Sequence, residues 1–270
     1  MFIQAKTLES FSMNATDGEL GSIADLYFES NTFTLRYFVG DTRTWFFGGK
    51  VLLSPESVTS IEQEKERIDV NLTKEQIKDS PKPSAHEPVS RQYEAELRDH
   101  YGWRHYWGAP IGGASAGMGS PGSYPAAPGM MIPHPIANPN LNRTEDEQDA
   151  MTQQTEQNTL QSINDLRGYK IHVKNGEVGK ALDFMLNEHD WTINYIIVDV
   201  GGTFTREPVP LAAEWITDIS WQDKTITVSV DKELIESAPD YEIHEPFTRE
   251  DETRLYAHYD RSPYWEGIEK

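Results

Sequence analysis

The chain has 270 residues, 25% of them charged and 37% hydrophobic, and its formal net charge of −20 disfavours direct binding to nucleic-acid phosphates or anionic headgroups. The sequence contains no cysteine, which excludes disulfide bonds, thiolate metal sites and cysteine nucleophiles. Because it has neither the apolar run of about 18 residues that a membrane span needs nor the pattern of a signal peptide, we expect a soluble cytoplasmic protein.

An internal repeat dominates the sequence. Residues 8–107 align with residues 166–265 at a spacing of 158 without a gap, and about 30 of the 100 aligned positions are identical. Self-similarity at a fixed spacing is typical of a duplicated structural unit. The sequence therefore predicts two copies of one small domain, which agrees with the usual size of protein domains.

Each repeat opens with a predicted β-hairpin. Asp-Gly and Asn-Gly pairs favour tight hairpin turns because they tolerate positive φ. The apolar positions beyond each turn break strict alternation once, which predicts a β-bulge. The predicted turn and bulge residues are Asp17, Gly18 and Gly21 in the first repeat and Asn175, Gly176 and Gly179 in the second.

Further strands and one short helix follow in each repeat. Residues 33–41 and 191–199 are rich in aromatic and β-branched side chains, which favours strands. Residues 50–72 and 208–230 predict a strand, a short turn and a hairpin. Thr73 and Gln76 then form a capping-box pattern before a helix at 74–78, and Asp231 is the expected cap of a helix at 232–236. About six short strands and one short helix suit a closed or partly closed barrel.

Three paired motifs resemble the PRC-barrel family, named for the cytoplasmic domain of the photosynthetic reaction centre H subunit. They are "DGELG" with Asp25 and "NGEVG" with Asp183, "LRYFVGD" and "INYIIVD", and "KVLLSPESV" and "PVPLAAEWI". The resemblance implies a mainly β protein with two small PRC-type barrels in tandem. It implies no particular activity, since the family also includes ribosome-maturation factors whose barrel is a protein-docking module.

Each repeat ends in a helical arm with an aromatic pair. The arm helices are predicted to begin after Ser90 and Thr248 and to reach Tyr101 and Tyr259. Large amphipathic aromatics are common interface anchors, although in a small domain they more often pack on its own core. We expect the arm to cover a barrel, either that of its own repeat or that of the other repeat. The candidate interaction residues are Tyr106, Trp107, Tyr264 and Trp265.

These elements define the expected domain boundaries. We expect a first barrel at 1–80, its arm at 81–107, a linker at 108–160, a second barrel at 161–238 and its arm at 239–270. The linker is rich in Gly and Pro and then acidic, which is typical of a flexible tether. Its reach allows the barrels to pair as an intramolecular pseudo-dimer, to form a homodimer or to hold separate partners.

A repeated His-Glu pattern in the arms raises the question of a metal site. Imidazole and carboxylate groups are competent ligands for divalent metals. A spacing of 14 residues between the histidines nevertheless places them on no common helical face, so caps and ion pairs are the favoured interpretation. The candidate ligands are His86, Glu87, His100, His244, Glu245 and His258.

No local pattern in the sequence marks a catalytic residue or a cofactor. We therefore interpret the chain as a non-enzymatic interaction or assembly module whose partner is another protein, without direct nucleic-acid contact. Two alternatives remain open. One is a metal- or small-ligand-binding protein that uses the repeated His-Glu residues, and the other is an adaptor linked to ribosomes or RNA processing.

Overall fold

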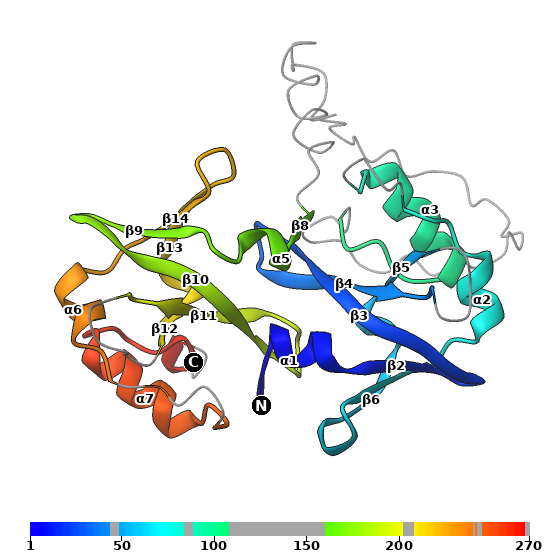
Figure 1. Ribbon diagram of the computed structural model, residues 1–270, viewed down its shortest axis with the longest axis horizontal. Coiled ribbons are helices and arrows are strands. Elements are labelled where there is room, and N and C mark those ends of the chain that lie inside the picture. The colour runs from blue at the N-terminus through cyan, green and yellow to red at the C-terminus, as the bar shows by residue number, and fades with distance from the viewer. Residues whose placement is uncertain are drawn as a thin grey trace, which may run out of the picture. The chain divides into compact units, whose positions relative to one another are not determined.

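The computed structural model describes residues 1–43, 49–83, 89–107, 160–201, 208–239, 241 and 245–267. The chain divides into two compact units, one formed by Met1–Val89 with Thr159–Lys270 and the other by Ser90–Asn158. The first unit contains both β-sheets, and the fold is mainly β (Figure 1). No described helix combines the length and the apolar composition that a membrane crossing requires.

The first repeat forms one sheet. Its strands are β2 (Ser12–Ala15), β3 (Gly18–Glu29), β4 (Thr34–Asp41), β5 (Lys50–Leu53), β6 (Val58–Glu62) and β7 (Arg67–Val70). They lie in the order β5-β4-β3-β2-β7-β6, and all pairs are antiparallel except β2 with β7. A seventh strand, β8 (Leu160–Ser162), adds to β3 from the start of the second repeat.

The second repeat forms the matching sheet. Its strands are β9 (Lys170–Val173), β10 (Gly176–Asn187), β11 (Ile193–Asp199), β12 (Val209–Ala212), β13 (Ile216–Ser220) and β14 (Thr225–Val228). Their order, β12-β11-β10-β9-β14-β13, repeats that of the first sheet. Here the seventh strand is β1 (Phe2–Gln4), which pairs with β10 from the start of the first repeat.

The sheets are open within the described residues, so the expected closed or partly closed barrels are not confirmed. Within the described residues the terminal strands β5 and β6 share no hydrogen-bonded ladder, and neither do β12 and β13. A short 3-10 turn joins each terminal pair, namely η1 (Pro55–Ser57) and η3 (Ala213–Trp215). Such a turn redirects the chain between consecutive strands without placing them edge to edge.

The hairpin turns place their positive φ on glycine. Gly18 and Gly176 adopt φ values of +137° and +133°, and each begins the strand after the turn. The ladder then shifts register across Leu20 and Val178, which are the extra residues of the bulges and lie next to the glycines where the sequence predicts a bulge. Both side chains are buried. The bulge therefore lets each strand turn an additional apolar residue toward its core.

Short helices flank the strands. They are α1 (Ala5–Ser10), α2 (Lys74–Asp79), α3 (Arg91–Tyr101), α5 (Ile163–Leu166), α6 (Lys232–Glu236) and α7 (Arg249–His258), with 3-10 turns η2 (Gln63–Lys65) and η4 (Tyr264–Gly267). The capping box of Thr73 and Gln76 is confirmed at α2. Asp231 occupies the N-cap position of α6, but the expectation that its side chain caps the helix is wrong, because it forms no capping hydrogen bond.

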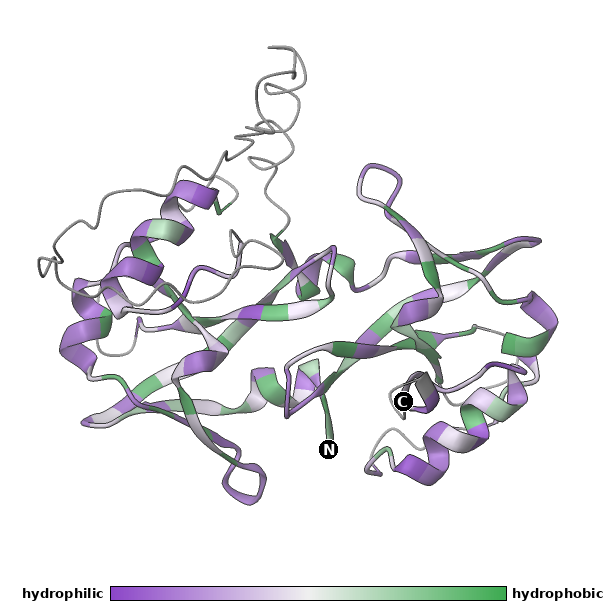
Figure 2. Cartoon of the chain, turned by 180° about the vertical axis from the view of Figure 1, so that it is seen from behind, coloured by the Kyte–Doolittle hydropathy of each residue, from purple (hydrophilic) through white to green (hydrophobic). Residues whose placement is uncertain are grey.

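Hydrophobic residues concentrate on the strands, whereas the tips of the β6–β7 and β13–β14 hairpins are hydrophilic (Figure 2). Equivalent core positions are filled by Leu26, Phe28 and Tyr37 in the first sheet and by Phe184, Leu186 and Tyr195 in the second. All are at most 1% exposed. Burial of such side chains contributes about 1.5–3 kcal/mol each, which makes the two sheets the main source of stability.

The bulge glycine of the second repeat should be intolerant of any side chain. A Cβ on Gly179 would lie 2.0 Å from the backbone oxygen of Asp199, whereas a Cβ on Gly176 would meet open space. Both residues have positive φ, so alanine at either position carries the conformational cost, but only alanine at position 179 also clashes with the backbone. We expect Gly176→Ala to lower the free energy of unfolding by about 1 kcal/mol and Gly179→Ala by about 3 kcal/mol or more in urea titrations. Equal losses would contradict the close approach at Gly179.

Candidate functional site

The two repeats exchange their first strands. Phe2 of β1 pairs with Asn187 of β10, and Leu160 of β8 pairs with Glu29 of β3. Each member of the first pair is offset by 158 residues from a member of the second, so the two pairings are related by a pseudo-twofold axis. The starting strand of each repeat therefore completes the sheet of the other repeat, as in a domain-swapped dimer whose chains have been joined.

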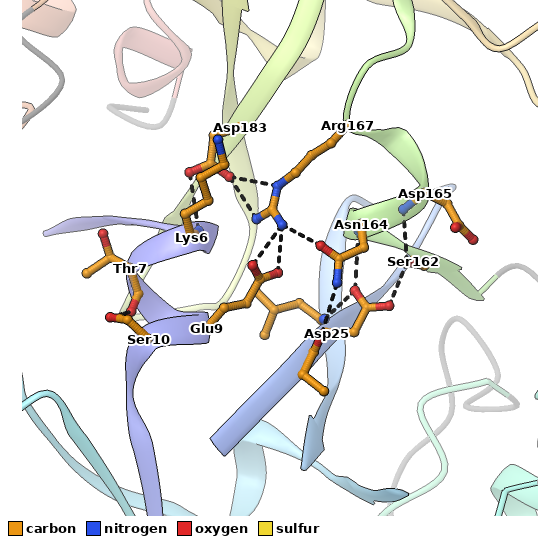
Figure 3. Close-up of polar contacts among 12 residues, drawn as sticks. Lys6, Thr7, Glu9, Ser10, Asp25, Ser162, Asn164, Asp165, Arg167 and Asp183 are labelled. Atoms are coloured by element: carbon orange, nitrogen blue, oxygen red, sulfur yellow. Dashed lines mark hydrogen bonds and ion pairs between the residues drawn. The ribbon is translucent and has the colours of Figure 1, made fainter. Parts of the chain in front are cut away.

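Each exchanged strand leads into a short helix that is capped by an aspartate of the other repeat (Figure 3). The backbone amide of Lys6 in α1 donates to Oδ2 of Asp183 at 3.2 Å. The equivalent amide, that of Asn164 in α5, donates to Oδ1 of Asp25 at 3.3 Å. A carboxylate at a helix N-terminus accepts from an amide without an intrahelical partner and interacts favourably with the helix dipole.

The two aspartates are buried in different surroundings. Asp25 also accepts from the Ser162 hydroxyl at 2.6 Å and from the amide of Leu26 at 2.7 Å, whereas Asp183 accepts from the guanidinium of Arg167 at 3.0 Å. Asp25 is 7% exposed and Asp183 is fully buried. Burial raises the pKa of both carboxyl groups, although the hydrogen bonds of each oppose this effect.

Arg167 links this site to Glu9 of α1 (Figure 3). Its Nη1 atom donates to the two carboxylate oxygens of Glu9 at 3.0 and 2.7 Å and also contacts the side-chain oxygen of Asn164. The side chains of Glu9 and Arg167 are only 18% and 16% exposed, which limits screening by solvent. Burial raises the pKa of Glu9 even though Arg167 opposes the shift.

A second contact lies on the same pseudo-twofold axis. The amide of Ile193 donates to the carbonyl of Phe33 at 2.7 Å, and the amide of Leu35 donates to the carbonyl of Trp191 at 2.8 Å. Phe33 and Trp191 are equivalent residues and have φ values of +53° and +61°. Positive φ is unfavourable for bulky residues. The two hydrogen bonds between the repeats offset this cost and fix the backbone there.

We call the set of Lys6, Glu9, Asp25, Ser162, Asn164, Arg167 and Asp183 the repeat junction. Its carboxylates accept from amide, hydroxyl and guanidinium donors, so its evident role is to hold the repeats together. Among the residues that the structure describes, no group of three or more His, Asp or Glu side chains is placed to hold a metal ion. Sequence reasoning noted Asp25 and Asp183 only as motif residues and missed Glu9 and Arg167. Glu9 and Arg167 are offset by 158 residues, so the repeat alignment could have identified them as equivalent positions with opposite charges.

The aromatic pair of the second repeat packs onto its own arm. Arg249 of α7 pairs with the buried Glu252 at 2.7 Å, and its guanidinium carbon lies 4.1 Å from the ring centroid of Trp265. Glu252 also accepts from the hydroxyl of Tyr195 on β11 at 2.5 Å and from that of Tyr264 at 3.1 Å. Tyr264 and Trp265 are half-buried by these contacts. Both residues thus pack within the second repeat, and their role as interface anchors stays a prediction.

The unit Ser90–Asn158 carries the same arrangement in its own arm. Arg91 of α3 pairs with Glu94 at 3.1 Å, and the hydroxyl of Tyr106 donates to Glu94 at 2.5 Å. The guanidinium carbon of Arg91 lies 4.5 Å from the ring centroid of Trp107. The four residues match Arg249, Glu252, Tyr264 and Trp265 at the repeat spacing. The aromatic pairs therefore form, in each repeat, a clamp around a buried glutamate.

The candidate metal ligands have varied positions. His86, Glu87 and His244 lie outside the described residues. His100 is exposed beside the ring of Tyr101, and Glu245 is exposed. The Nε2 atom of His258 lies 2.8 Å from the backbone oxygen of Leu234, to which it donates. This bond occupies one of its two ring nitrogens, and the metal site as a whole stays a prediction.

A groove runs along β13, the terminal strand of the second sheet. It is lined by residues of β13 and its following turn and by the turn before β4, namely Ile216, Thr217, Asp218, Ile219, Trp221, Ser30 and Phe33. Within the described residues β13 pairs only with β14. The sequence could not reveal this groove, because its walls come from different repeats.

No family model and no curated protein sequence matches this chain. The structure shows a mainly β fold with two matching sheets. Membership of the PRC-barrel family stays a prediction that depends on the sequence motifs.

The burial of Asp25 predicts a distinctive pH dependence. Its pKa is raised in the folded protein, so the folded state binds a proton more tightly than the unfolded chain. The contribution of Asp25 to the free energy of unfolding is therefore complete below its unfolded pKa and is lost as pH rises through the folded value. We expect the stability of the wild type relative to Asp25→Asn to be greater at pH 4 than at pH 7.5 in urea titrations.

Ser162→Ala provides the matched comparison. The Ser162 hydroxyl opposes the rise in the pKa of Asp25, so its removal should widen this pH dependence. A stability difference that is constant, or that increases with pH, would contradict the assignment.

Proposed function

We propose that this protein is a non-enzymatic assembly module, built from two PRC-type barrels, that binds another protein. The duplicated fold and the resemblance to a family that includes protein-docking barrels support this function. The observation that carries it is the groove along β13, where a strand edge that pairs with no other described strand lies beside apolar side chains.

An extended peptide is the ligand that such an edge fits best. A terminal strand offers backbone donors and acceptors on its outer side, and a peptide can add to it as a further strand. Ile216, Ile219 and Trp221 of the second repeat, together with Phe33, supply the apolar surface that would receive alternate side chains of the peptide. Backbone pairing then provides affinity, and the apolar contacts provide selectivity.

Charge favours a basic or neutral partner. Asp218 lies in the groove, and the whole chain carries a net charge of −20. Complementary charge increases the rate of association and disfavours acidic competitors. We therefore propose an extended segment with apolar residues at alternate positions and at least one Lys or Arg.

The first repeat differs at the corresponding place. The equivalent of Trp221 is Gln63, whose side-chain amide donates to Glu188 at 2.5 Å. Glu188 is in turn the equivalent of Ser30. A polar contact thus replaces the aromatic wall in the first repeat, which makes the groove of the second repeat the favoured binding place.

The matched positions provide a direct test. We expect Ile219→Lys with Trp221→Ser to reduce the affinity for the partner at least about tenfold, since both changes remove apolar contact area. Ile61→Lys with Gln63→Ser makes equivalent changes in the first repeat and should leave binding unchanged. The measurement is co-purification with mass spectrometry, followed by titration of the purified partner, after thermal unfolding confirms that each variant is folded.

The outcomes separate the alternatives. A stoichiometric partner that binds both variants equally would contradict the groove. The absence of any stoichiometric protein partner, or turnover of a substrate by the purified protein, would contradict an assembly module. Stoichiometric metal in elemental analysis would favour the metal-binding alternative, and a basic ribosomal protein as partner would favour the ribosome-linked one.

A further inference from the structure

The repeat junction departs from its own pseudo-symmetry at one position. Leu8 matches Leu166 and Asp25 matches Asp183, but Glu9 matches Arg167. In a symmetric dimer, a residue that contacts its own equivalent meets an identical side chain. Glu9 and Arg167 are equivalents and contact each other with opposite charges. This contact exists only when the first repeat pairs with the second.

A first repeat paired with another first repeat would have no arginine at this place, and the junction's remaining cation would be Lys6, which is exposed. Two copies of Glu9 would meet beside two copies of Asp25, and no residue equivalent to Arg167 would be present. Asp25 is buried and Glu9 is only 18% exposed in the observed junction. Like charges in such a place repel each other with little screening, which strongly disfavours this pairing.

A second repeat paired with another second repeat would lose a different contact. Each Arg167 would keep Asp183 of its own repeat, but the two guanidinium groups would meet and neither would have Glu9. The two bonds of 3.0 and 2.7 Å to the Glu9 carboxylate would be absent. This pairing is also disfavoured, although less severely, because the aspartates balance the arginine charges.

We propose that the ion pair of Glu9 and Arg167 specifies which repeats can pair. The exchange surface of each repeat accepts the complementary repeat of the same chain and rejects a copy of itself. The repeats thus form a fused heterodimer in which charge, in addition to the covalent linker, dictates the pairing. The strand exchange and the helix caps supply affinity in any pairing, because both repeats have the capping aspartate and the helix amides that it accepts from belong to the backbone. The ion pair supplies the discrimination.

Cleavage of the linker shows whether the exchange surfaces select their partner without the covalent link. A site for a sequence-specific protease is placed within residues 108–158 of the full-length protein, which is purified intact and then cleaved. Unlabelled and isotope-labelled samples are mixed in mild denaturant, diluted to native buffer and analysed by native mass spectrometry. We expect complexes of first with second repeat to exceed self-pairs of the first repeat at least about 30-fold.

Charge variants test whether Glu9 and Arg167 specify the pairing of the repeats. We expect Arg167→Glu to weaken the mixed complex at least about tenfold, and Glu9→Arg added to Arg167→Glu to recover most of this loss. Arg167→Met, which keeps the aliphatic stem without charge, should give an intermediate loss and serves if Arg167→Glu fails to fold. Lys170→Glu makes the same kind of change on the second repeat outside the junction and should have no effect.

Several results would overturn the proposal. A statistical mixture of self-pairs and mixed pairs would show that the surface does not discriminate. Separation of the fragments on cleavage in native buffer would show that the linker alone holds the repeats together. A double variant no better than Arg167→Glu alone would assign the loss to altered packing instead of charge pairing.

Discussion

A buried aspartate that caps a helix of the other repeat is the contact on which the architecture depends. Helices as short as α1 and α5 are unstable by themselves, because few intrahelical bonds compensate for nucleation. Asp183 and Asp25 supply an acceptor at the start of each helix, next to the strands that the repeats exchange. Each cap therefore stabilises a helix and also fixes the point at which the chain enters the neighbouring sheet.

This constraint connects folding to the proposed function. Because both starting strands add to the other repeat, the two sheets depend on each other for a complete set of seven strands. The groove along β13 has walls from both repeats, so its shape requires the exchanged arrangement. The clamps around Glu94 and Glu252, in contrast, are built within single arms. Pairing of the repeats would thus be a condition for partner binding.

Local chemistry was predictable from the sequence, and contacts between distant segments were not. The glycines at the turns and the capping box of Thr73 act within a few residues, so their patterns identified the hairpins and α2 correctly. The exchanged strands have only three residues each and show no periodicity. The bond between Ser162 and Asp25 joins residues 137 positions apart, which no local pattern encodes. Closed or partly closed barrels were expected from the number of short strands, but the number of strands does not specify whether the terminal strands pair.

Hydrogen exchange of individual backbone amides measures directly whether the capped junction between the repeats forms. The amides of Lys6 and Asn164 lie near the starts of their repeats, yet each donates to a buried aspartate of the other repeat. We expect both amides to be protected at least about 100-fold over an unstructured peptide, with opening energies that approach those of β3 and β10. Exchange of both amides at the unprotected rate, with β3 and β10 still protected, would contradict the exchanged and capped junction.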